Sequence, residues 1–184
     1  MLPLLMTLWL ASTPAHAITG IEKGPLLELG AGLGVTGQPT QPALGVHASI
    51  GWWAGTYDTA YAFGRYWALV STTRLDALPA AGTWSLAPML EVRRGIDIFV
   101  ANPAFFVSGG PVLSIPVGPS AAGDPLGATG RTGLAFKLRR SRFWGLTLRV
   151  EAGVDVVSST VRPAGGVMVG GGFARPARKM EKTK

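Results

Sequence analysis

Cysteine is absent from this chain of 184 residues, and charge is scarce: 15% of its residues are charged, against roughly 25% in ordinary globular proteins. The lack of cysteine excludes disulfides, thiolate metal sites and a cysteine nucleophile. With only two histidines, a histidine-based metal site has no support, and no cofactor is expected. The chain is instead rich in glycine (26 residues) and in hydrophobic residues (47%), which excludes a disordered protein and is unusual for a soluble enzyme domain. Its length fits one domain.

The N-terminal segment, residues 1–17, has the pattern of an export signal. An apolar run over residues 2–10 precedes a small-x-small cleavage site, Ala15-His16-Ala17. The run is too short to cross a bilayer as a helix, which needs about 20 residues. We therefore expect export and cleavage after Ala17, although no Lys or Arg precedes the run.

The C-terminal segment, residues 174–184, holds most of the excess positive charge. Five basic residues and one acidic residue give it a net charge of +4, out of +7 for the whole chain. We expect a solvated, disordered tail that contacts lipid headgroups or cell-wall polymer. No basic patch elsewhere is interleaved with aromatic residues, so we expect no nucleic-acid partner.

Between these ends, residues 18–173 are organised by alternation. Residues 146–156 alternate apolar and polar side chains without a break, as a strand with one apolar face requires. Residues 27–35, 44–53, 84–93, 134–139 and 167–173 repeat the pattern less perfectly, and residues 60–70 and 105–117 are weaker candidates. This makes eight predicted strands. Glycine, proline, serine and threonine predict loops at residues 36–43, 71–83, 118–130 and 158–165, with short connections at 54–56, 94–96 and 141–143.

The polar positions of these strands, which all lie on one face, are unusual because they combine glycine with side chains of opposite charge. Such a set suits a narrow interior, where backbones approach closely and buried ions need partners. The predicted interior polar network consists of Glu28, His47, Glu91, Arg93, Lys137, Arg139, Arg149, Glu151 and Asp155. The apolar parity would then face lipid, and most segments have roughly the 9–11 residues that a tilted transmembrane strand needs. Aromatic residues close to the predicted strand ends suit the membrane interface: Trp52, Trp67, Trp84, Phe143 and Trp144.

These features predict an all-β fold: an up-and-down antiparallel transmembrane β-barrel of about eight strands. The chain resembles the small OmpA/OmpX-type outer-membrane barrel proteins in its signal, its eight alternating segments and its glycine-rich final segment, GGVMVGGGF. The resemblance implies a Gram-negative outer-membrane location and recognition of the terminal aromatic, Phe173, by the barrel-insertion machinery. The chain departs from that pattern by continuing eleven residues past Phe173.

One pair of residues carries an enzymatic alternative. His47 and Ser49 have an H-x-S spacing that resembles the His/Ser pair of outer-membrane lipid A deacylases. Parity places both residues on the interior side, however, and the flanking asparagines of that motif are missing. We therefore expect no catalysis, and expect His47 to be an interior residue hydrogen-bonded to a carboxylate such as Glu28.

The leading interpretation is a small outer-membrane barrel with a structural or surface-interaction role, its interior plugged by the charged network and its long loops facing outside. Outer-membrane lipid would be its main partner. Two alternatives stay open at this point. One is an exported, soluble, lipocalin-like ligand-binding barrel, which would expose Arg149 and Glu151 to water. The other is an outer-membrane lipid-modifying enzyme that uses His47 and Ser49.

Overall fold

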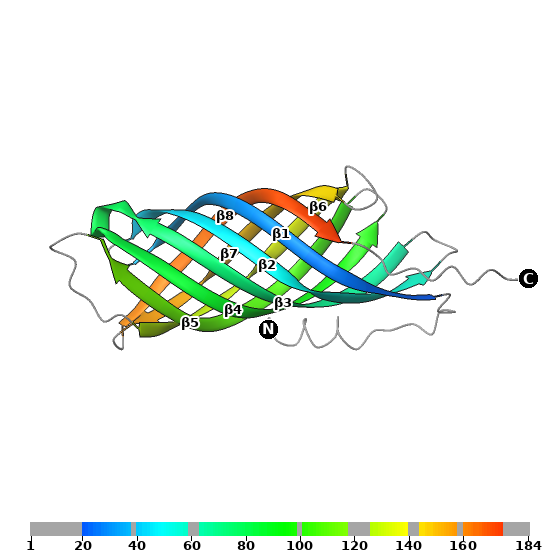
Figure 1. The fold of residues 1–184 in the computed structure, drawn as a ribbon, viewed down its shortest axis with the longest axis horizontal. Helices are drawn as coiled ribbons and strands as arrows, with labels where there is room; N and C mark the ends of the chain where they lie inside the picture. The colour runs from blue at the N-terminus through cyan, green and yellow to red at the C-terminus, as the bar shows by residue number, and fades with distance from the viewer. Residues whose placement is uncertain are drawn as a thin grey trace, which may run out of the picture.

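A computed structural model describes residues 20–37, 40–58, 63–98, 101–117, 126–139, 144–157 and 160–174. Its strands are β1 (Gly20–Thr36), β2 (Gln41–Asp58), β3 (Phe63–Leu78), β4 (Thr83–Ile98), β5 (Ala101–Pro116), β6 (Leu126–Arg139), β7 (Trp144–Val157) and β8 (Thr160–Ala174). Each strand pairs antiparallel with the next, and β8 pairs with β1, so the sheet closes into an eight-stranded barrel (Figure 1). The predicted fold class is confirmed.

The only other element among the described residues is a short 3₁₀ helix, η1 (Pro79–Ala81), which turns β3 into β4. No helix in this part of the chain is long and apolar enough to span a bilayer. The weaker strand candidate at residues 105–117 lies almost entirely within β5. The predicted signal segment lies outside the described residues, as does the tail after Ala174, which is the last residue of β8.

Two of the predicted short connections are wrong. Residues 54–56 lie inside β2, and residues 94–96 lie inside β4. Their glycines suggested turns, but Gly55 and Gly95 instead make room for Tyr66. A Cβ at Gly95 would lie 2.4 Å from the Tyr66 ring carbon Cζ, and one at Gly55 would lie 2.9 Å from the Tyr66 Cβ. These glycines allow strands to pass close to an aromatic ring, and the strands continue through them.

The predicted loop at residues 71–83 is also wrong, because β3 continues to Leu78 and only η1 and Gly82 separate it from β4. Ser71 and Thr73 occupy the outward parity of β3, so the apolar-polar alternation is interrupted although the strand is not. Two other loops shrink to residues 37–40 and 158–159, while β6 begins at Leu126 within the predicted loop 118–130. Residues 118–125 and the predicted connection at 141–143 lie outside the described residues.

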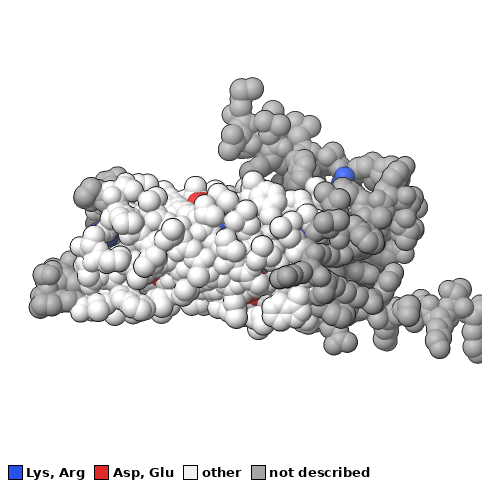
Figure 2. Space-filling view, turned by 90° about the horizontal axis from the view of Figure 1, so that it is seen from above, with Lys and Arg blue, Asp and Glu red and all other residues white. Residues whose placement is uncertain are grey.

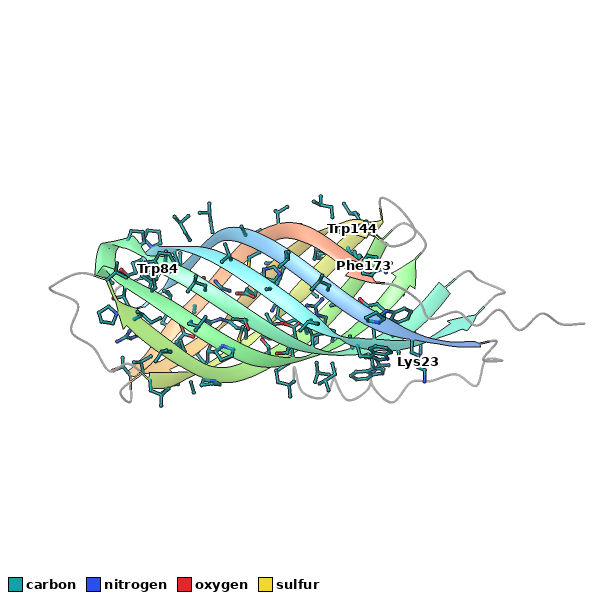
Figure 3. All side chains as sticks on the ribbon, viewed as in Figure 1. Lys23, Trp84, Trp144 and Phe173 are labelled. Carbon is teal, nitrogen blue, oxygen red and sulfur yellow. The ribbon has the colours of Figure 1, made fainter. Side chains whose placement is uncertain are left out.

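The barrel has two distinct ends (Figure 1). We call the end at which β1 begins and β8 ends the terminal end. The opposite end, at which β1 turns into β2 and β3 turns into β4, is the hairpin end. Figure 3 shows Lys23, Trp144 and Phe173 towards the terminal end and Trp84 at the hairpin end.

The predicted parity of the side chains is confirmed. On β7, for example, exposed and buried residues alternate from Trp144 to Ala152, with Leu146, Leu148 and Val150 outside and Thr147 and Arg149 inside. Each strand therefore contributes one set of side chains to the lumen and another to the outer wall.

Candidate functional site in the barrel lumen

A chain of ion pairs occupies the middle of the lumen. It contains seven residues of alternating charge, all buried: Glu28, Arg93, Glu91, Arg149, Glu151, Arg74 and Asp76. Neighbouring inward positions of one strand supply three of the links, Arg93 to Glu91, Arg149 to Glu151 (2.9 Å) and Arg74 to Asp76 (2.6 Å). These i, i+2 spacings follow from the alternation of a strand, because two residues along the chain return to the same face.

The other three links join strands that are not neighbours in the sheet. The Arg93 Nη1 atom on β4 lies 2.5 Å from the Glu28 Oε2 atom on β1. The Arg149 Nη2 atom on β7 lies 2.7 Å from the Glu91 Oε2 atom on β4, and Arg74 on β3 pairs with Glu151 on β7. Because β3 and β7 are four strands apart in an eight-stranded ring, this last pair crosses the full width of the lumen.

A second group, a single ion pair separate from the seven-residue network, lies further towards the hairpin end. The Arg131 Nη2 atom on β6 is 2.7 Å from the Asp155 Oδ1 atom on β7. Asp155 also accepts hydrogen bonds from the hydroxyls of Thr129 (2.7 Å) and Thr36 (3.2 Å). The buried acids and arginines of the interior therefore hold partners of opposite sign, which is the condition under which buried charge is tolerated.

Apolar side chains pack on both sides of the seven-residue network. Towards the terminal end, Leu26, Ala68 and Val70 form a buried cluster with Trp53 against it. Towards the hairpin end lies a second cluster, made of Ala87, Met89, Val112 and Val157. In addition, the Phe106 ring is fully buried, and the Arg149 guanidinium carbon lies 3.7 Å from its centroid. Charged and apolar layers thus succeed one another along the lumen.

His47 and Ser49 both face the interior, as their parity predicted, and both are buried. The Ser49 hydroxyl lies 3.0 Å from the Thr72 hydroxyl, and His47 Nδ1 lies 3.1 Å from the Met168 sulfur. The prediction that His47 is hydrogen-bonded to a carboxylate such as Glu28 is therefore wrong. His47 stands opposite Gly30 on β1, and its ring lies over that glycine, where a Cβ would come within 2.5 Å of the ring.

The residues predicted to form the interior polar network do not all belong to one network in the structure. Glu28, Glu91, Arg93, Arg149 and Glu151 belong to the seven-residue chain, whereas Asp155 belongs to the second pair and His47 to neither. Half-buried Lys137 lies on the inward parity of β6, where its side chain would contact a Cβ at Gly145. Arg139 is the last residue of β6, and its side chain lies outside the described residues.

Sequence reasoning missed three charged members of the interior. Arg74 and Asp76 fell in the predicted loop 71–83, and Arg131 fell just beyond the predicted loop 118–130. A signal was present, because Thr72, Arg74 and Asp76 recur with a period of two. It was hidden by the hydroxyl side chains at alternate positions of the same segment.

The outer wall is apolar over nearly all of its described surface. Among the described residues, its exposed large hydrophobic side chains are twenty-nine Leu, Val, Ile and Trp residues. In the space-filling view, the described wall shows only a few charged atoms (Figure 2). Soluble monomers rarely expose a continuous apolar surface of more than a few hundred Å². Arg149 and Glu151, which a soluble ligand-binding barrel would expose, are 2% and 5% exposed, so the orientation required by that alternative is not found.

The height of this apolar belt follows from its boundaries on β4. Trp84 stands at the hairpin end of the strand, and Arg94 stands ten residues later, over the ring of Trp67 on β3. With about 3.4 Å per residue and a strand tilt of roughly 40°, these ten residues cover about 25 Å along the barrel axis. That height equals the apolar band of about 25 Å typical of transmembrane barrels.

Comparison with known proteins gives likeness in fold. No protein-family model and no curated protein sequence matches the chain. Among solved structures, Neisserial surface protein A (NspA) is similar with a TM-score of 0.52 and 10% identity, covering 85% of this chain and 99% of NspA. The outer membrane enzyme PagL gives a TM-score of 0.48 and 17% identity, covering 78% of this chain and 97% of PagL. Ail, the attachment invasion locus protein of Yersinia pestis, gives a TM-score of 0.30 and 10% identity, covering 84% of this chain and 99% of Ail.

The NspA likeness is one of fold, and it agrees with the closed ring of eight strands. The chain therefore has the fold of the small eight-stranded outer-membrane barrels, which its alternating sequence resembled.

Proposed function

We propose that this protein is a small outer-membrane barrel with a structural or surface-interaction role, its lumen plugged by its own side chains. The observation that carries the proposal is the reversal of the usual protein surface: an apolar outer wall around a lumen in which the acids and arginines are buried. In hydrocarbon, an apolar outer wall is favourable. A closed barrel is favourable there as well, because it leaves no sheet edge with unpaired backbone groups. In water, it would expose the whole belt.

The plug is supported by the links that cross the lumen. Ion pairs connect β1 to β4, β4 to β7 and β7 to β3, and the buried Phe106 ring stacks beneath Arg149. An eight-stranded barrel has an interior just wide enough for its own side chains to fill. We therefore expect reconstituted protein to give no stable ion conductance in a planar bilayer. Discrete, long-lived channel openings of the native protein would contradict the plug.

A surface role would fall to the connections of the hairpin end. Most of them are short: four residues between β1 and β2, four between β3 and β4, and two between β7 and β8. The connection between β5 and β6, residues 117–125, is longer, with nine residues. It is our candidate for contact with a partner outside the cell. Replacing it by a short Gly/Ser turn should abolish surface contact and leave the barrel folded.

Other expected partners follow from the position of the barrel. Outer-membrane lipid would contact the belt, and the basic tail would contact headgroups or cell-wall polymer. Phe173 at the end of β8 would serve the barrel-insertion machinery. In the folded barrel its ring lies 5.9 Å from the Trp144 ring in an edge-to-face arrangement, so it also belongs to the aromatic girdle.

Location and fold can be tested together. We expect the protein in the outer-membrane fraction after cleavage of the signal, and expect folded and boiled samples to migrate differently on a denaturing gel. Recovery of native protein from the periplasm without detergent would contradict the proposal.

We expect no catalysis. Ser49 and His47 face the lumen and contact Thr72 and Met168, so neither is presented to lipid. Cells that carry the His47→Ala variant should have the same lipid A composition as cells with the native protein. A change in lipid A acylation that depends on His47 and Ser49 would instead establish the enzymatic alternative.

A further inference from the structure

The seam between β4 and β5 differs from the other seven seams of the barrel. Along the described strands, every other pair of neighbours is matched residue by residue without an interruption. The β4–β5 pairing is interrupted at residues 87–89 of β4 and 110–112 of β5, and its register is the same on both sides of the gap. This register places Pro88 opposite Pro111 at the centre of the gap.

The two prolines account for the gap. In an antiparallel pair, opposed residues alternate between those that exchange two backbone hydrogen bonds and those that exchange none. Proline has no N–H, so two prolines opposed at an exchanging position lose both bonds, and the pairing fails over three residues, as it does here. A shorter interruption at residues 96–97 faces Pro103 and has the same cause. Proline within sheets is normally confined to edge strands and bulges, whereas a closed barrel has no edge.

The gap at Pro88 lies within the apolar belt. Pro88 is four residues from Trp84, which places it about 10 Å inside the hairpin-end boundary by the conversion used for the belt height. Hydrocarbon offers no donor to a carbonyl group that the sheet leaves unpaired. The backbone is therefore held less firmly here than along the neighbouring β3–β4 seam, where the pairing continues through Pro88.

The interior directly behind the gap is apolar. Three of the four residues of the hairpin-end cluster adjoin the two prolines in the chain: Ala87, Met89 and Val112. Met89 also reaches across the seam, because its sulfur lies 3.8 Å from the hydroxyl oxygen of Ser108 on β5. Methionine is unbranched and flexible, so its side chain can change its path without strain. The weakest part of the described seams thus separates hydrocarbon from an apolar layer of the lumen.

We propose that β4 and β5 part locally at Pro88 and Pro111 and admit an acyl chain of a surrounding lipid to the apolar cluster. Met89 is the movable cover of this entry. An acyl chain suits the path, because the path leads from hydrocarbon to uncharged side chains. The entry is lateral, so the charged network still closes the lumen along the barrel axis. This inference rests on the proposed membrane location, and it adds a lipid-binding site to it.

Methionine itself supplies the probe. Photo-methionine carries a diazirine that inserts into nearby C–H bonds on irradiation, and it would replace Met89 behind the gap and Met168 behind uninterrupted pairing. Both side chains face the lumen and are 4% and 1% exposed, so Met168 is an internal control. The full-length protein would be irradiated in phosphatidylcholine vesicles, and lipid adducts located by mass spectrometry. We expect an acyl-chain adduct at Met89 and none at Met168.

Restoring the missing donors should close the entry. Pro88→Ala together with Pro111→Ala returns two backbone hydrogen bonds to the seam and should reduce the Met89 adduct by about tenfold. Pro163→Ala is the matched control, because this proline lies on β8 within uninterrupted pairing, and it should leave the adduct unchanged. Heat-dependent gel migration shows whether each variant is folded. If the double variant is not, Pro88→Ala alone restores one bond and should reduce the adduct by about threefold.

Three results would overturn the proposal: adducts at both methionines, an adduct at neither, or a Met89 adduct that persists when the donors are restored. Leu90→Met separates these results from failure of the proposed function, because position 90 is the outward neighbour of Met89. An adduct at position 90 without one at Met89 shows a barrel in lipid whose seam stays closed. No adduct at position 90 contradicts the membrane location itself.

Discussion

Arg149 and Val150 are adjacent on β7 and have opposite surroundings. Arg149 is 2% exposed and contacts Glu91, Glu151 and the Phe106 ring, each in a defined direction. Val150 is 43% exposed and lies on the open outer wall. The inner surface of the barrel thus depends on particular partners, whereas the outer surface depends only on a class of side chain. The two surfaces should therefore respond in opposite ways to changes of charge and of volume.

Loss of a central charge should have the largest effect. Glu91 is fully buried and pairs with both Arg93 and Arg149, so Glu91→Ala leaves two arginines short of a partner. We expect the free energy of unfolding to fall by about 3–5 kcal/mol. Val92→Ala, on the outward side of the next residue, should change it by less than about 0.5 kcal/mol. Urea unfolding in vesicles, followed by tryptophan fluorescence, measures both, and equal effects would remove the distinction between the surfaces.

The converse change places an arginine outside. Val150→Arg should destabilise the inserted barrel by about 2–4 kcal/mol, because the side chain lies near the middle of the belt. Leu138→Arg, on the outward parity close to the terminal end, should cost only about 0–1 kcal/mol. Folding into vesicles at increasing urea concentration gives both values. A cost that does not depend on depth would show that the belt is not in hydrocarbon.

Added volume should separate the surfaces by a smaller amount. A Cβ at inward Gly170 would lie 2.0 Å from the Leu29 carbonyl oxygen, so Gly170→Ala must displace a strand and should cost about 1–3 kcal/mol. At outward Gly130 no atom lies within 4 Å of the same position, so Gly130→Ala should be neutral or stabilise by up to about 1 kcal/mol. The same unfolding assay measures the pair. If the two alanines cost the same, the glycines of the lumen are not there to allow close packing.

The contrast between the surfaces also explains how far the sequence could predict the structure. Apolar residues such as Leu146, Leu148 and Val150 show the outer face directly, because facing outward there requires only an apolar side chain. Prediction failed on β3, where outward Ser71 and Thr73 carry hydroxyls and inward Arg74 and Asp76 were assigned to a loop. The turns predicted at the glycines of β2 and β4 were wrong for a related reason, since these glycines pack against Tyr66 inside continuous strands.

The partners across the lumen could not be predicted from the sequence. Parity shows that Glu28 and Arg93 both point inward, but their pairing depends on the tilt and stagger of eight strands, which fix the residues that meet at the same height. The same geometry places His47 beside the Met168 sulfur, and it places Glu28 where it accepts a hydrogen bond from Arg93. The charged set was thus largely visible in the sequence, and its connections were not.

The central claim is that one face of each strand meets lipid while the other meets a sealed lumen. The chain has no cysteine, so single nitroxide labels can be placed at outward positions 146, 148, 150, 152 and 154 of β7 in vesicles. Accessibility to dissolved oxygen and to a water-soluble nickel complex is then compared by electron paramagnetic resonance. The structure predicts high oxygen and low nickel accessibility, with their ratio highest near position 150. High nickel accessibility at positions 148–152 would place this face in water and contradict the account.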